Sequence, residues 1–380
     1  MKGPFGRVSP PEVLWWTTVG FLGLGRFTFP RELVGYSGMG AVYGFAMLCA
    51  VAYGSGLLIV ALMRRFPGWT AIEIAVATMG TGGRVFEFVM GSIMLLILAE
   101  AYSLFAFLLR ESTLPFTPVW AVLALAGAAV AYGMAVGVEA ISRTLRILGP
   151  FFLAVALAGA TLIFTRARLT MMIPHWTGWG PELRGAYSAV YILSGLQSVF
   201  IFSGFAPSGS LRRGVLLGLT TAFTVLVAVL FGTIGSLGVD ALPLITWPAA
   251  MLARALDVPG FYVERVGFIS MIAVIGSVLL FLIETTVVVA VAMTQTLALP
   301  NSAYRLVGGG VVVLTVIGAI LIPNVSAAEY IARSVVSPLT LFMLLAKPLI
   351  LAAAVWAAVH RAKRAVHLGA PPARRVRVRG

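Results

Sequence analysis

Residues 20–33 read GFLGLGRFTFPREL and interrupt an apolar run near the N-terminus. The three glycines each weaken a helix by about 1 kcal/mol relative to alanine, and Pro30 weakens it further. Arg26 adds a positive charge where a membrane-spanning helix accommodates one least easily. The stretch therefore predicts a membrane helix that is broken, and charged at its break.

The composition places most of the chain in a membrane. Of the 380 residues, 60% are hydrophobic and 11% are charged, and the mean hydropathy is +1.01. A soluble domain carries about 25% charged residues. Apolar runs of about 20 residues recur along the chain and short alternating segments do not, which predicts an all-α polytopic membrane protein rather than a β-barrel.

The apolar runs predict about ten transmembrane helices with short connections. They lie near residues 12–34, 39–63, 86–109, 118–137, 145–165, 186–205, 214–237, 265–296, 303–323 and 336–360. No long polar segment remains that could form a second domain. We therefore expect a single transmembrane, permease-like domain over residues 1–362 and a basic cytoplasmic tail over residues 363–380.

The net charge of +14 comes largely from the end of the chain. Basic residues after a last membrane span are typical of a cytoplasmic anchor that contacts anionic membrane lipid, and we favour this interpretation over nucleic-acid binding. An even number of spans then places both termini on the cytoplasmic side. The residues concerned are Arg361, Lys363, Arg364, Arg374, Arg375, Arg377 and Arg379.

The sixth predicted span is interrupted by glycines like the first, at YILSGLQSVFIFSGFAPSG, residues 191–209. The first and sixth spans occupy corresponding positions if ten spans form two halves of five. Interrupted helices at matching positions of two halves are the best sequence pointer to a transporter-type site near the middle of the membrane.

Each interruption frees backbone N–H and C=O groups that lipid cannot satisfy, so they must face protein, water or a ligand. The positive end of the following half-helix favours a carboxylate. We therefore expect these main-chain groups to bind a small zwitterionic molecule; the alternative is that the glycines only allow close helix packing. The candidate residues are Gly23, Leu24, Gly25 and Arg26 in the first span and Ser194, Gly195, Leu196 and Gln197 in the sixth.

Three other ionisable residues lie within predicted spans, where a charge is costly and normally faces the bundle interior or a water path. Glu100 and Glu284 lie deepest. Either can pair with Arg26, take up a proton or meet the amino group of a ligand; a structural ion pair or an interhelical hydrogen bond is an equal alternative. Lys347 lies nearer the inner boundary, where its side chain can reach the membrane surface, so it is not counted among the candidate site residues.

Signals of catalysis are weak. The three histidines lie in a loop and in the tail, and no metalloprotease, nucleophile-elbow or nucleotide-binding motif occurs in the sequence. Cys49 is the single cysteine, which excludes a disulfide framework and a thiolate zinc site. The sequence therefore predicts no enzyme, no metal and no cofactor.

Several motifs resemble a known family. LGLGRFTFP (22–30) resembles the glycine-interrupted opening helix of the amino acid–polyamine–organocation permease superfamily, and YILSGLQSVF (191–200) resembles its sixth helix. LPLITWPAAMLARALDVPGFYVERVGFISMIAVIGSVLL (242–280) and LLRESTLPFTPVWAV (108–122) resemble bacterial spore germination permeases, the B subunits of nutrient germinant receptors. The most specific piece is PGFYVER at 259–265.

This resemblance implies a leucine-transporter-type fold, a 5+5 inverted repeat with interrupted helices 1 and 6. It implies a sensor of small germinants, often L-amino acids, in the inner membrane of a dormant endospore, beside an A subunit and a lipoprotein C subunit. The family's ligand contacts correspond to Gly23–Gly25 and Gly195–Gln197 of this chain. Two departures are Gln197, where an acidic residue is common, and Arg26, where an apolar residue is usual.

Other functions stay open on the sequence. A proton-coupled amino-acid permease of the same fold predicts the same pocket and differs in whether the ligand crosses the membrane. An intramembrane enzyme or a passive scaffold is the third possibility. The missing catalytic constellation speaks against an enzyme, and a scaffold needs no interrupted helices.

Overall fold

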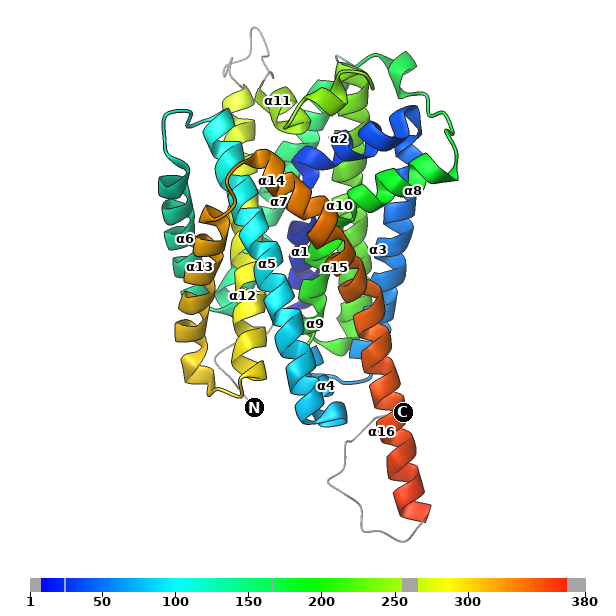
Figure 1. Cartoon of the computed structure of the whole chain (residues 1–380), viewed down its shortest axis with the longest axis vertical. Helices are drawn as coiled ribbons and strands as arrows, with labels where there is room; N and C mark the ends of the chain where they lie inside the picture. Colours follow the sequence, from blue (N-terminus) through cyan, green and yellow to red (C-terminus); the bar gives the residue numbers. More distant parts are fainter. Residues whose placement is uncertain (1–7, 24, 166, 255–265, 368–380) are drawn as a thin grey trace.

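Helices and connecting loops make up residues 8–23, 25–165, 167–254 and 266–367, the parts of the chain that the computed structural model describes, and no strand occurs within them (Figure 1). The elements in chain order are α1 (Pro10–Phe21), α2 (Gly25–Ser37), η1 (Gly38–Gly40), α3 (Ala41–Met63), α4 (Ala71–Met79), α5 (Thr81–Ser112), α6 (Val119–Val136), α7 (Val138–Phe164), η2 (Leu169–Met172), α8 (Trp179–Ser188), η3 (Val190–Ser198), α9 (Val199–Phe202), α10 (Ser208–Leu237), η4 (Leu242–Leu244), α11 (Pro248–Arg254), α12 (Val266–Thr296), η5 (Asn301–Ala303), α13 (Tyr304–Ile320), α14 (Val325–Ile331), η6 (Ala332–Val336), α15 (Ser337–Leu341), η7 (Phe342–Ala346) and α16 (Lys347–His367).

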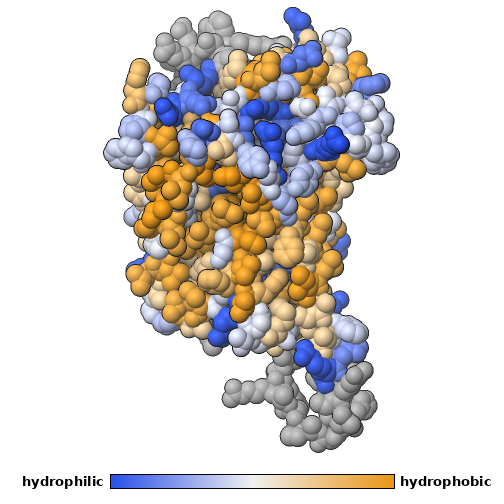
Figure 2. Space-filling model, in the orientation of Figure 1, coloured by the Kyte–Doolittle hydropathy of each residue, from blue (hydrophilic) through white to orange (hydrophobic). Residues whose placement is uncertain are grey.

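The helices form a membrane-spanning bundle. In the described chain, eight helices are long and apolar enough to cross a membrane, or nine if α8, η3 and α9 count as one bent span. The run Phe27–Met63 counts as a single helix because α2 continues into α3 through η1. Taking α1 with α2 as one interrupted span, followed by α3, gives the ten predicted spans. Figure 2 shows the corresponding apolar belt, with hydrophilic residues gathered at the two ends.

The two ends of the bundle differ. Figure 1 shows α2, α8, α11 and α14 gathered at one end, called the α2 end below, and α16 ending at the other. Helix α2 crosses the α2 end, whereas α3 descends along the bundle. The half-helix α2 therefore covers the interior of the bundle from one side.

The first predicted span breaks where its glycines predict. Helix α1 ends at Phe21, and α2 begins at Gly25. On one side α1 packs along α10, where Gly214 and Gly218 face Val13 and Thr17. The side chains that hold α1 in the bundle are thus separate from the break.

The sixth span is bent by 47° between α8 and the segment Val190–Phe202. The first nine residues of that segment, η3, form a 3₁₀ helix. Such helices rarely exceed three or four residues, because their hydrogen-bond geometry is poorer than that of an α-helix. An unusually long 3₁₀ stretch inside a span therefore marks a strained segment at the predicted interruption.

The last span begins at Val325, whereas the sequence predicts a start near residue 336. Two π-helical turns interrupt it, η6 and η7. Each lies just before a proline, Pro338 or Pro348. A proline lacks an N–H and collides with the carbonyl four residues earlier, and a local π turn accommodates both defects. The prolines thus bend the span without ending it.

Candidate binding site at the two interrupted helices

The two interruptions meet inside the bundle, backbone against backbone. A Cβ atom added to Gly20 would lie 3.1 Å from the carbonyl oxygen of Gly195, and one added to Gly195 would overlap the Gly20 carbonyl. No side chain fits between these main chains. Gly195 therefore serves close packing against the end of α1, as small residues do at membrane helix contacts.

A small cavity lies beside this contact. Its volume is about 30 Å³, room for no more than a few water molecules. Its lining combines residues at the first break with polar side chains from two other segments, α5 and η3. The residues are Gly20, Phe21, Gly23, Ile97, Glu100, Ala101, Leu104, Tyr191, Ile192, Ser194, Phe281 and Val336.

A second, smaller cavity lies next to the first. It measures about 10 Å³ and is lined by Ser194 and Phe281, as the first is, together with Gln197, Thr285 and neighbouring apolar side chains. The amide nitrogen of Gln197 has no hydrogen-bond partner in the described part of the molecule. The two adjoining cavities therefore form one polar region inside the bundle, with room for only a few water molecules.

Not all of the predicted ligand-binding residues line these cavities. Leu196 is fully buried, with its side chain near Gly56 of α3, and lines neither cavity. Leu24 lies outside the described residues, and so do the surroundings of Gly25 and the side chain of Arg26. Gly23, Ser194 and Gln197 thus adjoin the cavities, whereas Gly195 packs against the end of α1 and Leu196 against α3.

Glu100 projects from α5 into the first cavity. The residue is buried, and one of its carboxyl oxygens has no hydrogen-bond partner among the described groups. An unpartnered polar atom in the interior costs about 1–3 kcal/mol, and more if it is charged. A bound proton, or an ammonium group of a ligand, would remove this cost.

Glu284 lies on α12, and it too is buried with one unpartnered carboxyl oxygen in the described part of the chain. It forms a side-chain hydrogen bond with Ser198 of η3. It lines neither cavity, although the next residue, Thr285, lines the smaller one. The two carboxyl groups that the sequence singles out are thus both interior, but only Glu100 faces the first cavity.

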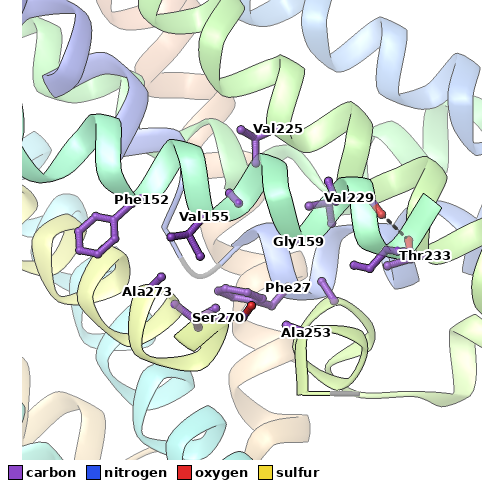
Figure 3. Close-up of a pocket in the computed structure, with 15 residues that line it drawn as sticks. Phe27, Phe152, Val155, Gly159, Val225, Val229, Thr233, Ala253, Ser270 and Ala273 are labelled. Carbon is purple, nitrogen blue, oxygen red and sulfur yellow. Dashed lines mark hydrogen bonds between the residues drawn. The ribbon is translucent and has the colours of Figure 1, made fainter. Parts of the chain in front are cut away.

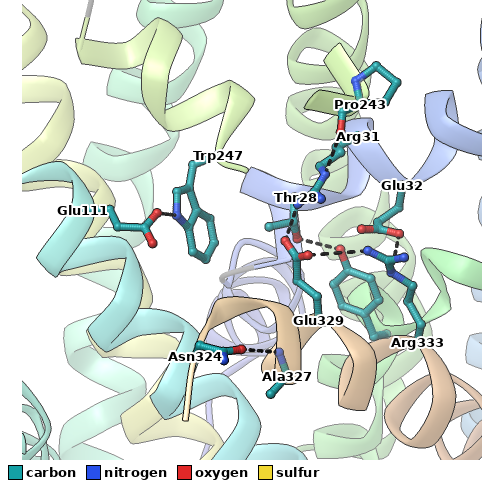
Figure 4. Close-up of polar contacts among 11 residues, drawn as sticks. Thr28, Arg31, Glu32, Glu111, Pro243, Trp247, Asn324, Ala327, Glu329 and Arg333 are labelled. Carbon is teal, nitrogen blue, oxygen red and sulfur yellow. Dashed lines mark hydrogen bonds and ion pairs between the residues drawn. The ribbon is translucent and has the colours of Figure 1, made fainter. Parts of the chain in front are cut away.

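A network of four charged side chains closes the α2 end above this region (Figure 4). Arg31 of α2 pairs with Glu329 of α14, and Arg333 of η6 pairs with both Glu32, at 2.8 Å, and Glu329, at 3.5 Å. The Nε–H of Arg31 also donates to the carbonyl oxygen of Pro243 at 3.0 Å. The network joins the first span to the last.

The sequence predicts none of these four residues as part of a site, because each lies near the end of a predicted span, where a charge can reach water. A signal was present, since Glu329 and Arg333 are spaced four residues apart, as in helical ion pairs. Two of the network residues, Glu329 and Arg333, line a cavity of about 870 Å³ at the α2 end, called the vestibule below. Its lining is Tyr36, Leu183, Arg184, Tyr187, Ser188, Ser326, Glu329, Tyr330, Arg333 and Ser334.

Tyr191 lies between the charged network at the vestibule and the buried cavity that contains Glu100. Its hydroxyl lies 2.6 Å from that of Thr28 on α2. Tyr191 lines the first cavity with Glu100, and it also lines a void of about 10 Å³ with Glu329 and Arg333. The route from the vestibule to Glu100 therefore passes the charged network and then the Tyr191 side chain.

The side chain of Lys347 stays inside the bundle. It does not reach the membrane surface, which its position in the sequence would allow. Its ammonium nitrogen lies 2.8 Å from a carboxylate oxygen of Glu87 on α5, and both residues are buried. The same nitrogen lies 4.7 Å from the centre of the Phe200 ring of α9. A carboxylate and an aromatic face together compensate a charge that would otherwise have to reach water.

A further pocket of about 70 Å³ lies between α2, α7, α10, α11 and α12 (Figure 3). Its lining is apolar apart from Thr233 and Ser270, and the Thr233 hydroxyl donates to the carbonyl oxygen of Val229 at 2.8 Å. This pocket offers a zwitterionic molecule no charged side chain. The cavities at the interruptions suit such a ligand better.

Two interrupted helices that meet inside an all-helical bundle define the class in the part of the chain that the structure describes, a multi-pass membrane protein of the leucine-transporter fold. The crystal structure of MhsT in complex with L-phenylalanine is similar, with a TM-score of 0.59 and 15% sequence identity over 91% of this chain and 98% of that chain. At this identity the likeness establishes the fold alone.

Residues 7–329 match the model of the spore permease family, described as spore germination protein, and the chain therefore belongs to that family. A search of curated proteins finds no match. The resemblance predicted from the sequence is thus confirmed at the level of the family. Its most specific piece, residues 259–265, lies outside the described residues.

Proposed function

We propose that this chain binds a small germinant, an L-amino acid, between the interrupted helices, and acts as the membrane-embedded sensing subunit of a germinant receptor. The observation that carries the proposal is the buried, unpartnered carboxyl oxygen of Glu100 in a cavity between the two breaks. Membership of the spore germination family and the L-phenylalanine bound to MhsT support the same class of ligand.

The two ends of an amino acid have complementary partners here. The ammonium group pairs with the carboxylate of Glu100, and the carboxylate of the ligand lies against the N-terminal end of α2, whose dipole favours an anion. The hydroxyl of Ser194 and the amide of Gln197 adjoin the same region. The ligand is bound and released unchanged, so we propose no catalytic role.

Sensing requires two states with different affinity for the ligand. The described state is closed, because the charged network separates the vestibule from cavities too small for an amino acid. A ligand that binds the open state better shifts the population towards it. We place the α2 end outside and both termini in the cytoplasm of the spore inner membrane. Germinant receptor A and C subunits are then the partners that respond to this conformational change.

Binding to the purified protein in detergent tests this function directly. L-amino acids, glucose and inosine are titrated while thermal stability is followed, because a ligand stabilises the state it binds. Glu100→Gln should weaken amino-acid binding about 10- to 100-fold, the equivalent of one charge-assisted hydrogen bond. Glu111→Gln is the matched control, since Glu111 lies on the same helix and accepts a bond from Trp247 at 2.7 Å. Equal affinity of Glu100→Gln and the unmodified protein contradicts the proposed site.

A proton-coupled amino-acid permease is the second candidate. It is favoured by the second buried carboxyl group, Glu284, whose free oxygen could carry a proton. Such a permease would accumulate ligand inside proteoliposomes when a proton gradient is imposed. A sensor binds the ligand without accumulating it, so uptake distinguishes the two functions.

A further inference from the structure

The phenyl ring of Phe281 lies where the two small cavities meet. The residue is on α12, is 6% exposed and lines both cavities. Glu100 lines only the first cavity and Gln197 only the second, whereas Ser194 and Ile97 line both, as Phe281 does. The ring is therefore part of the wall between two adjoining polar spaces.

The same ring covers the break in the first span. A Cβ atom on Gly23 would lie 2.8 Å from Cγ of Phe281, so only a glycine backbone fits beneath the ring. In the proposed function the main chain at this break contacts the ligand. Phe281 thus occupies the space next to the groups that the ligand needs.

The volumes of the two cavities show that no amino acid fits beside the Phe281 ring in this state. The cavities measure about 30 and 10 Å³, which is water-sized space. Cavities of about 150 Å³ in other proteins accommodate benzene. Truncation of a phenylalanine removes a group of benzene size, so the space that Phe281 fills is comparable with the side chain of a large amino acid.

We propose that Phe281 sets the size limit of the ligand. The ring closes the empty site, and when it turns aside it leaves room for an amino acid with a small side chain. A bulky side chain competes with the ring for the same volume and is excluded. This proposal rests on the proposed function, since it specifies which amino acids the same site accepts.

The test compares affinities for glycine, L-alanine, L-leucine and L-phenylalanine in the full-length protein and in two variants, Phe281→Ala and Phe281→Leu. The unmodified protein should prefer the small ligands. Phe281→Ala should shift the ratio of L-leucine to L-alanine affinity at least tenfold towards L-leucine, in the range that single side-chain contacts contribute to discrimination. Phe281→Leu, which keeps a branched apolar side chain and so the packing of the core, should shift it less, in the same direction.

Phe152→Ala is the matched control. Phe152 of α7 packs against Gly276 of α12, the helix that carries Phe281, much as Phe281 packs against Gly23. Phe152, however, lines the apolar pocket. Its truncation should leave the ratio unchanged. If the unmodified protein binds amino acids and both Phe281 variants keep its size preference, the size-limit proposal is wrong while the proposed function stands. If the unmodified protein binds no amino acid, the proposed function fails first.

Discussion

Lys347 and Glu87 form an ion pair inside the bundle, with side chains only 4% and 2% exposed. The pair ties the last span to α5, and the contact of Lys347 with Phe200 adds the sixth span. The charged network at the α2 end ties the same last span to the first. Both connections run through one helix that carries two π-helical turns, so the last span links the two ends of the bundle.

Removing one partner of this buried pair should destabilise the protein strongly. Lys347→Met leaves Glu87 with an uncompensated buried charge, which should lower the free energy of unfolding by about 3–5 kcal/mol. The double variant Glu87→Gln/Lys347→Met should recover most of the loss, because no unpaired charge remains. Denaturant unfolding in detergent measures all three proteins.

An exposed pair provides the comparison for this cycle. Arg143 and Glu139 lie 2.6 Å apart, with side chains 70% and 47% exposed. Arg143→Gln should change the free energy of unfolding by less than about 1 kcal/mol, as expected for surface pairs. A Lys347→Met variant as stable as Arg143→Gln would show that the buried pair contributes little to the bundle.

Opening the charged network should expose the buried cavities. Glu329→Gln removes the partner that Arg31 and Arg333 share. A cysteine at position 194, introduced as Ser194→Cys with Cys49→Ala, reports access because Ser194 lines both cavities. We expect a small charged thiol reagent to react at least several times faster with it when Glu329 is replaced.

Arg184→Gln is the control for this measurement. Arg184 lines the same vestibule but lies outside the network. Its replacement alters the charge of the vestibule and should leave the reaction rate within about twofold. Equal rates in the Glu329→Gln and parent proteins would mean that access to Ser194 is controlled elsewhere, with Tyr191 and Thr28 as the next candidates.

Two glycines allow the role of backbone contact to be separated from helix propensity. Gly195→Ala would force a methyl group into the Gly20 carbonyl and should destabilise the protein by about 1–3 kcal/mol. At Gly54 of α3 a Cβ atom meets nothing within 4 Å. Gly54→Ala should therefore be neutral or stabilising by up to about 1 kcal/mol, since alanine favours a helix. Similar unfolding midpoints for the two variants would contradict tight packing between the interruptions.

The sequence predicted the breaks better than it predicted the charges. Glycine and proline act locally through the backbone, so the interruptions at Gly23 and Ser194 could be placed from residue type alone. The ion pairs join residues as far as 298 positions apart, as Arg31 and Glu329 are. The spacing of Glu329 and Arg333 indicates a pair within one helix, but no local pattern tells which charges meet between helices. Lys347 illustrates the difficulty, because its burial depends on Glu87 and on a helix that packs against it only in the folded bundle.

The role of Gly195 shows a second limit. A glycine that binds a ligand through its main chain and one that permits close packing look alike in a sequence. Only the position of Gly20 against it reveals packing. Phe281 was not a candidate for a related reason, since an apolar residue in a membrane span carries no polar signal and its importance comes from the two cavities it separates.

Glu284→Gln should separate sensing from proton-coupled transport. Glu284 lines neither cavity, so the variant should bind L-amino acids with an affinity within about threefold of the parent. Its stability should be equal or higher, because a neutral amide can keep the bond to Ser198 without the cost of a buried carboxyl group.

In proteoliposomes with an imposed proton gradient, neither protein should accumulate labelled L-alanine if the chain is a sensor. Uptake by the parent that disappears in Glu284→Gln, with binding retained, would instead identify a permease with Glu284 as its proton carrier. Glu111→Gln should behave as the parent does in both assays, because its carboxyl group bonds Trp247 away from both cavities.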